Sequence, residues 1–235
     1  MKRVLCGLLE ICIRVKKDKV SVYAAQATLF IIISVMPFLL LLLNFVKADW
    51  LLNITDDIYR SDTVSVISVT TVTALWAASK GTMALINGLD NIFGVSRGYV
   101  KTRLLSVAYT GIVLILLAIS VAGYAFIRLI AVFPVLLAFA VLTLTFALMY
   151  KFLPKKEKRL LYHLPGAVFS AGGWILFSGL YSQYVKYFAD YSKLYGSLST
   201  AVLFILWLYV CMNIFLWGAE INKYIAGNNR KGCTN

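Results

Sequence analysis

The chain of 235 residues is strongly apolar and strongly basic: 61% of its residues are hydrophobic, 14% are charged, and its formal net charge is +13 at pH 7. Average soluble domains contain roughly 45–50% apolar residues, whereas the mean hydropathy of this chain is +0.83. The charged residues gather between long apolar stretches and do not alternate with them as on the exposed faces of soluble helices. This pattern excludes a soluble globular domain and predicts a protein embedded in lipid.

Residues 1–22 form the first predicted element, an amphipathic helix. Apolar residues recur on one face at helical spacing and charged residues occupy the other face. The apolar set is Val4, Leu8, Ile11 and Val15, and the charged set is Arg3, Glu10, Arg14 and Lys17. Such a helix is expected to lie in the inner membrane interface, with its apolar face at the acyl boundary.

Six further segments are long and apolar enough to cross a bilayer, which requires about 20 mostly apolar residues. They cover residues 24–45, 64–83, 104–127, 133–153, 164–185 and 198–221. A helical stretch at 83–93 either continues the second span or bends away from it near Gly81. The predicted fold class is therefore an all-α membrane protein. It comprises a bundle of six transmembrane helices (residues 23–222), an N-terminal amphipathic interfacial helix (1–22) and a cytoplasmic tail (223–235).

The basic residues are unevenly divided between the two ends of this predicted bundle. Alternating spans place 18 of the 23 Lys and Arg residues at one end and leave five at the other: Lys47, Arg60, Arg128, Lys186 and Lys193. Cytoplasmic loops carry the excess of Lys and Arg, so both termini are predicted to be cytoplasmic. Attraction of this basic end to anionic inner-leaflet lipid accounts for the net charge, and no nucleic-acid partner is needed.

This topology predicts the outcome of cysteine labelling in intact cells. Single cysteines introduced at 47–62 and 186–194 should react with a membrane-impermeant reagent, because these two segments are predicted to face outward. Cysteines introduced at 155–162 should not react, because this segment is predicted to face the cytoplasm. Labelling is measured as a mass shift of the purified protein, and reversed accessibility would contradict the arrangement.

Polar residues near the inner ends of the spans mark a candidate substrate pathway. Ionisable residues near membrane depth are costly and therefore informative about function. Lys80 and Glu220 are each predicted at the inner end of a span, where they would form a charge pair across the bundle. Gln26, Asn87 and Asn222 are expected at a similar level. The alternative is a ring of helix ends in contact with interfacial water.

Pro37 extends this candidate pathway into the first span. Proline has no backbone N–H, which frees the Ile33 carbonyl near mid-membrane, and Ser34 is close enough in sequence to compensate. The expected kink is either a hinge that lines the pathway or a static bend accommodated by packing.

Small residues shape the last two spans. Gly166 and Ser170 have the four-residue spacing that lets helix backbones approach closely, which we interpret as packing. Before the sixth span, Tyr195, Gly196 and Ser197 predict a tight outer turn, because glycine permits the turn and Ser197 suits the N-cap of the following helix.

Signatures of catalysis are missing from the sequence. His163 is the single histidine, so one chain provides neither a histidine-rich metal cluster nor a His-based triad. Phosphate-binding loops and dinucleotide fingerprints are absent, and the four cysteines form no CxxC pair. We therefore expect no enzymatic activity, no bound metal and no cofactor.

Several short motifs together resemble the YihY/BrkB family of bacterial inner-membrane proteins, which has also been labelled ribonuclease BN-like. In chain order they are Ala24-Ala25-Gln26-Ala27, Ser34-Val35-Met36-Pro37, Trp76 to Gly81, Asn91 to Gly94 with Arg97 and Arg103, Pro165-Gly166-Ala167 with Trp174, Tyr195-Gly196-Ser197, Trp207-Leu208-Tyr209 and Gly218-Ala219-Glu220-Ile221-Asn222. Where the family usually has an acidic residue before the loop arginine, this chain has Ser96. The resemblance implies a bacterial inner-membrane protein linked to envelope function or serum resistance, with lipid or lipid-precursor transport proposed.

These observations lead to one expected function and two alternatives. The expected function is transport or flipping of an anionic envelope lipid or lipid precursor. It follows from a basic inner rim, polar groups at span depth and almost no extramembrane domain. The first alternative is a non-enzymatic scaffold or regulator of cell-envelope assembly, and the second is a ribonuclease. The expected partners are membrane lipids, chiefly anionic, and not nucleic acid.

Overall fold

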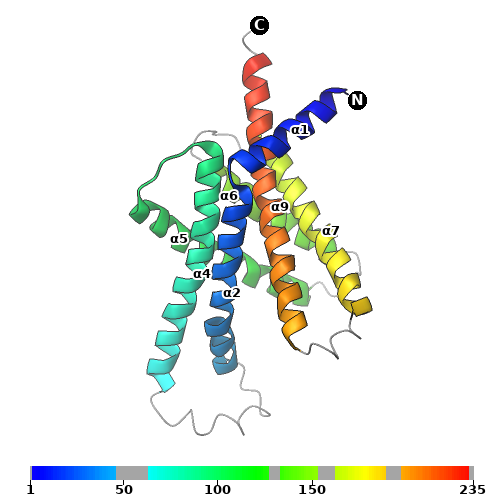
Figure 1. Cartoon of the computed structure of the whole chain (residues 1–235). Coiled ribbons are helices and arrows are strands. Elements are labelled where there is room, and N and C mark those ends of the chain that lie inside the picture. Colours follow the sequence, from blue (N-terminus) through cyan, green and yellow to red (C-terminus); the bar gives the residue numbers. More distant parts are fainter. Residues whose placement is uncertain (1, 46–62, 127–132, 153–161, 189–196, 233–235) are drawn as a thin grey trace.

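A computed structural model describes residues 2–45, 63–126, 133–152, 162–188 and 197–232 of the chain. These residues form seven helices: α1 (Lys2–Lys17), α2 (Val20–Phe45), α4 (Thr63–Phe93), α5 (Tyr99–Phe126), α6 (Phe133–Phe152), α7 (Leu164–Phe188) and α9 (Ser197–Gly232). The described residues contain no strand, so the all-α fold class is confirmed. Figure 1 shows that α1 and the C-terminal end of α9 lie at the same end of the bundle.

The helices follow the predicted spans and extend past several of them. The stretch at 83–93 continues α4 without a break, which decides between the two predicted alternatives. Within the described residues, three helices are long and apolar enough to cross a membrane, over Tyr99–Leu116, Leu164–Lys186 and Ala201–Ala226. The bent pair Glu10–Lys17 and Val20–Val35 makes a fourth if it is counted as one span. The chain is therefore a membrane protein by length and composition, and the count of six spans stays a prediction.

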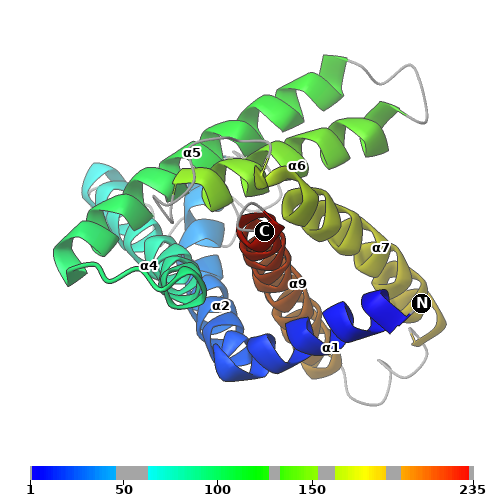
Figure 2. The same cartoon turned by 90° about the horizontal axis from the view of Figure 1, so that it is seen from above.

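A sharp bend separates the amphipathic helix from the first apolar helix. α1 and α2 meet at an angle of 57°, and Lys19 between them has a φ of 52°, a left-handed conformation that is uncommon for residues with a side chain. The bend carries α1 across the end of the bundle, where it contacts α9 (Figure 2). The predicted N-terminal helix is confirmed, and its place in the membrane interface stays a prediction.

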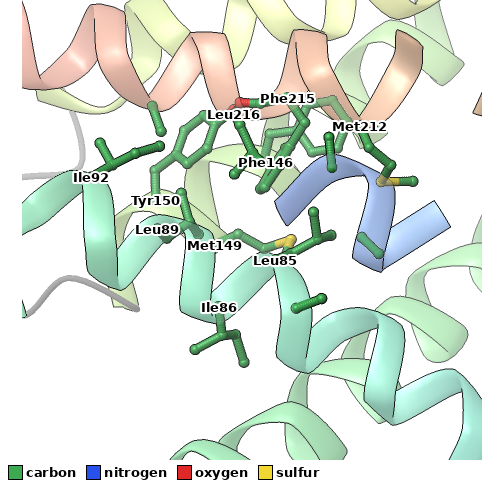
Figure 3. Close-up of a cluster of buried hydrophobic side chains, with 14 of the residues drawn as sticks. Leu85, Ile86, Leu89, Ile92, Phe146, Met149, Tyr150, Met212, Phe215 and Leu216 are labelled. Atoms are coloured by element: carbon green, nitrogen blue, oxygen red, sulfur yellow. The ribbon is translucent and has the colours of Figure 1, made fainter. Parts of the chain in front are cut away.

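The core lies around α9, which contacts α1, α2, α4 and α7. Figure 3 shows buried side chains from α4, α6 and α9 gathered between these helices. The ring of Tyr150 on α6 stacks on Phe215 of α9 with centroids 5.0 Å apart, and Phe146 meets Phe215 edge to face at 5.1 Å. The Tyr150 hydroxyl donates to the Phe215 carbonyl and lies 2.9 Å from the Ser170 hydroxyl, so this buried phenol is satisfied.

The small residues of α7 form its contact with α9, as their spacing predicts. Gly166 and Ser170 are buried against Gly218 of α9, where the absence of a side chain lets the two backbones approach closely. Asn222 on the next turn of α9 accepts a hydrogen bond from the Gly166 N–H at 2.8 Å and donates to the His163 carbonyl at 3.1 Å. The amide of Asn222 therefore joins α9 to the unsatisfied N-terminal turn of α7.

Candidate functional site

Four charged side chains gather where α1 turns into α2 and the end of α9 passes them. They are Arg14, Asp18, Glu220 and Lys223, here called the Asp18–Glu220 cluster. The Lys223 ammonium donates to the Asp18 carboxylate at 2.7 Å, and the side chain of Asn91 on α4 donates to the Asp18 carbonyl at 2.6 Å. The bend between α1 and α2 is thus tied to both α4 and α9 at a single residue, Asp18.

Glu220 is the most deeply buried member of this cluster. Its side chain is 0% exposed, and neither of its carboxyl oxygens has a hydrogen-bond partner among the described residues. The charged groups that act on it are Asp18, Lys223 and Arg14. An ionisable group without hydrogen-bond donors is costly to bury, and Glu220 lies within the candidate span Ala201–Ala226.

The predicted charge pair between Lys80 and Glu220 is wrong. Lys80 is exposed, with its ammonium 5.7 Å from the centre of the Phe30 ring, and no ion pair joins it to Glu220 within the described residues. Ser79, the preceding residue, is fully buried, and one residue of helix turns the side chain by about 100°. Lys80 therefore faces away from the core of the bundle. Glu220 has Lys223, one turn further along its own helix, as its nearest cationic partner in sequence.

Gln26 and Asn87 also stay apart from the buried carboxylate. Gln26 is exposed, whereas Ala24 and Ala27 on the same helix are fully buried, so Gln26 lies on the outer face of α2. Asn87 is half-buried. Asn222 is the one predicted amide that is fully buried, and its hydrogen bonds hold α7 against α9.

The predicted role of Ser34 beside Pro37 is also corrected. The buried Ser34 hydroxyl donates to the Ile31 carbonyl at 2.6 Å, so it does not compensate Ile33. An i−3 carbonyl is within easy reach of a serine hydroxyl on a helix. α2 continues through Pro37 as one helix, and the Pro37 side chain lies outside the described part. A hinge or kink at Pro37 stays a prediction.

The predicted outer turn falls largely beyond the described residues. Tyr195 and Gly196 lie outside them, and Ser197 is the first residue of α9. Its side chain is likewise not described, so its role as an N-cap stays a prediction. Among the described residues, no group of three or more His, Cys, Asp or Glu side chains is placed to hold a metal ion.

A second charged pair lies at the turn between α4 and α5, beyond the predicted second span. A terminal nitrogen of Arg97 lies 3.3 Å from a carboxylate oxygen of Asp90, and both side chains are 10% exposed. Burial raises the pKa of Asp90 to about 6, and the positive charge of Arg97 opposes that rise. Asp90 therefore remains mostly ionised at neutral pH and balances the charge of Arg97.

Beside this pair, a groove of about 550 Å³ runs between the turn and the first turns of α5. We call it the α4–α5 groove. Ser96, Arg97 and Lys101 lie along its polar part, and Leu104 and Ala108 lie along its apolar part. A cavity with basic groups at one end and aliphatic groups at the other suits an amphipathic anion.

Sequence reasoning did not single out Asp18 or Asp90, although both carried a signal. Asp18 is the one acid within a run of basic residues that includes Lys16, Lys17 and Lys19. Asp90 is the one acid of α4, on a face with the buried Ile86 and Leu89. A lone acid in a basic run or on an apolar face indicates an ion pair, but the partner is set by tertiary packing.

Comparison with known proteins identifies the family. The family model described as Virulence factor BrkB matches residues 11–232, a range that includes the Asp18–Glu220 cluster and the α4–α5 groove. The chain belongs to the BrkB family. The predicted resemblance is therefore confirmed.

Relatives of this BrkB-family protein carry names that give little chemistry. A Bacillus subtilis protein named as ribonuclease-like, YfkH, is 28% identical across 86% of this chain and 88% of its own length. UPF0761 membrane proteins of Idiomarina loihiensis and Aliivibrio fischeri are each 36% identical, over 32% and 37% of this chain and 27% of their own lengths. No solved structure matches the chain.

Proposed function

We propose that this BrkB-family protein moves an anionic envelope lipid or lipid precursor between the leaflets of the bacterial inner membrane, with both of its termini in the cytoplasm. The observation that carries the proposal is Glu220, a fully buried carboxylate in a candidate span with no hydrogen-bond donor among the described residues. Charged groups at such a position are rare in membrane helices and commonly mark substrate, ion or proton pathways.

The surroundings of Glu220 support a role beyond packing. Packing alone favours an apolar side chain at a buried position, because an ion that lacks hydrogen bonds keeps its desolvation penalty. The neighbouring Asp18, Lys223 and Arg14 provide charges of both signs at the end of the bundle. As a substrate enters the bundle, its negative headgroup replaces a carboxylate as the partner of Lys223 or Arg14.

The proposal is tested by lipid movement in reconstituted vesicles. Wild-type protein should speed the movement of fluorescent phosphatidylglycerol between leaflets, measured by reductive quenching of the outer leaflet. Glu220→Gln should slow this movement at least ~10-fold, which corresponds to ~1.4 kcal/mol of barrier. Lys186→Gln is the control, because it also replaces an ionisable side chain with glutamine, at an exposed position of α7 outside the Asp18–Glu220 cluster, and it should leave the rate unchanged.

Two results would contradict the proposal. Equal rates for the wild type and Glu220→Gln would remove Glu220 from the pathway. Failure of the wild type to move any anionic lipid, together with stoichiometric co-purification of an envelope enzyme, would favour the scaffold alternative.

A further inference from the structure

The α4–α5 groove begins at the turn that follows α4. Gly94 has a φ of 64°, a left-handed conformation suited to glycine at a helix end. The next residues run to Gly98, and α5 starts at Tyr99. This path places Ser96, Arg97 and Lys101 along one cavity of about 550 Å³. The C-terminal end of α4 lies at the same end of the bundle as the chain termini (Figure 1).

The polar part of the groove has unused capacity to bind an anion. Arg97 is nine-tenths buried, and its nitrogen nearest Asp90 makes no hydrogen bond among the described residues. A guanidinium has five N–H donors, so the ion pair with Asp90 leaves donors for another acceptor. Lys101 is exposed and has no ion pair in the described part of the chain. Because Asp90 balances the charge of Arg97, the ammonium of Lys101 is left as one uncompensated positive charge in the groove.

The apolar part of the groove continues onto a face of α5 whose exposed aliphatic side chains suit contact with lipid. Leu104 is 74% exposed and Val100 is 77% exposed, and both belong to the candidate span Tyr99–Leu116. Exposed aliphatic side chains on a membrane span meet acyl chains. The same face that carries Lys101 at the helix start therefore continues as a surface for a hydrocarbon chain.

The geometry points to a binding site for an anionic phospholipid in the α4–α5 groove. Arg97 and Lys101 hold its phosphate, and an acyl chain lies along Leu104 and Ala108. The two cations suit the phosphate group of the lipid, and the aliphatic wall beside them suits an acyl chain. This inference deepens the proposed function and rests on it for the class of lipid, while binding itself requires no movement between leaflets.

The test measures binding without transport. Purified full-length protein in a neutral detergent is titrated with phosphatidylglycerol, and bound lipid is counted by native mass spectrometry alongside the thermal unfolding midpoint. Phosphatidylcholine with the same acyl chains is the neutral comparison. Phosphatidylglycerol should bind and raise the midpoint. Ser96→Glu and Lys101→Gln should each weaken its binding about fivefold, since each changes the charge of the groove by one unit.

Matched variants separate the groove from general surface charge. Lys101→Arg should keep wild-type affinity because the charge stays. Lys186→Gln, at an exposed lysine of α7, should also keep it. Ser96 and Lys101 are exposed, so the lipid-free unfolding midpoints should match that of the wild type and show that the fold is intact.

The possible results distinguish this site from the proposed transport. If Ser96→Glu and Lys101→Gln leave the affinity for phosphatidylglycerol unchanged, the α4–α5 groove is not the binding site, even if lipid still moves between leaflets. Glycerol phosphate that binds as tightly as the lipid would overturn the acyl-chain part and leave only an anion site. Binding that follows the predicted variants while Glu220→Gln moves lipid normally would uphold the groove and contradict the proposed role of Glu220.

Discussion

Replacing Gly218 with alanine is expected to destabilise the bundle by ~1–3 kcal/mol, the usual range for an overpacked core. A Cβ atom at Gly218 would lie 2.6 Å from the Gly166 carbonyl oxygen and 2.8 Å from the Tyr150 hydroxyl. These distances are too short for carbon against oxygen, so α7 and α9 must move apart. Thermal unfolding in detergent measures the loss.

Replacement of glycine with alanine at positions that have room for a Cβ atom is the control. Gly179 of α7 and Gly111 of α5 have no atoms within 4 Å of an added Cβ. Alanine there should be neutral or stabilise the helix by up to ~1 kcal/mol, since glycine is the poorer helix former. If Gly218→Ala unfolds at the same temperature as Gly179→Ala, the close contact between α7 and α9 is wrong.

A second substitution identifies which contact limits the approach of the two helices. The Ser170 hydroxyl also lies in the path of a Cβ at Gly218, so Ser170→Ala should recover part of the stability lost in Gly218→Ala. Recovery should be incomplete because the Gly166 carbonyl belongs to the backbone and cannot be removed.

Removing Lys223 should have the next largest effect on stability. Lys223→Met leaves the Asp18 carboxylate without the ammonium that lies 2.7 Å from it, and an unpaired ion keeps its desolvation penalty. Asp18 and Lys223 are 16% and 30% exposed, so the expected loss is ~1–3 kcal/mol, below that of a fully buried pair. The free energy of unfolding in detergent is the measurement.

A double-mutant cycle isolates the interaction. Asp18→Asn combined with Lys223→Met should recover part of the loss, with a coupling of at least ~1 kcal/mol. Lys80→Met should change stability by no more than ~0.5 kcal/mol, because Lys80 is exposed and is not paired with Glu220. Additive effects of the Asp18 and Lys223 substitutions would show that this ion pair does not stabilise the bend.

The sequence by itself determined the helices of this protein. A run of about 20 apolar residues must satisfy its backbone polar groups internally when lipid is the solvent, and a helix does so within one segment. The ends of α6 and α7 therefore fall close to the predicted ones. The packing face of α7 was also predictable, because Gly166 and Ser170 are small at the spacing that brings them onto one side of a helix.

Only the tertiary structure decided which polar groups meet. Lys80 and Glu220 are both charged and near the ends of helices, so their sequence positions favoured a pair. A pair across a bundle depends, however, on the rotation of each helix about its axis, and one residue changes that rotation by about 100°. Burial of Ser79 turns Lys80 outward, while the bend at Lys19 brings Asp18 to Lys223. The α4–α5 groove likewise depends on how a turn packs against the helix that follows it, which no periodicity in the sequence encodes.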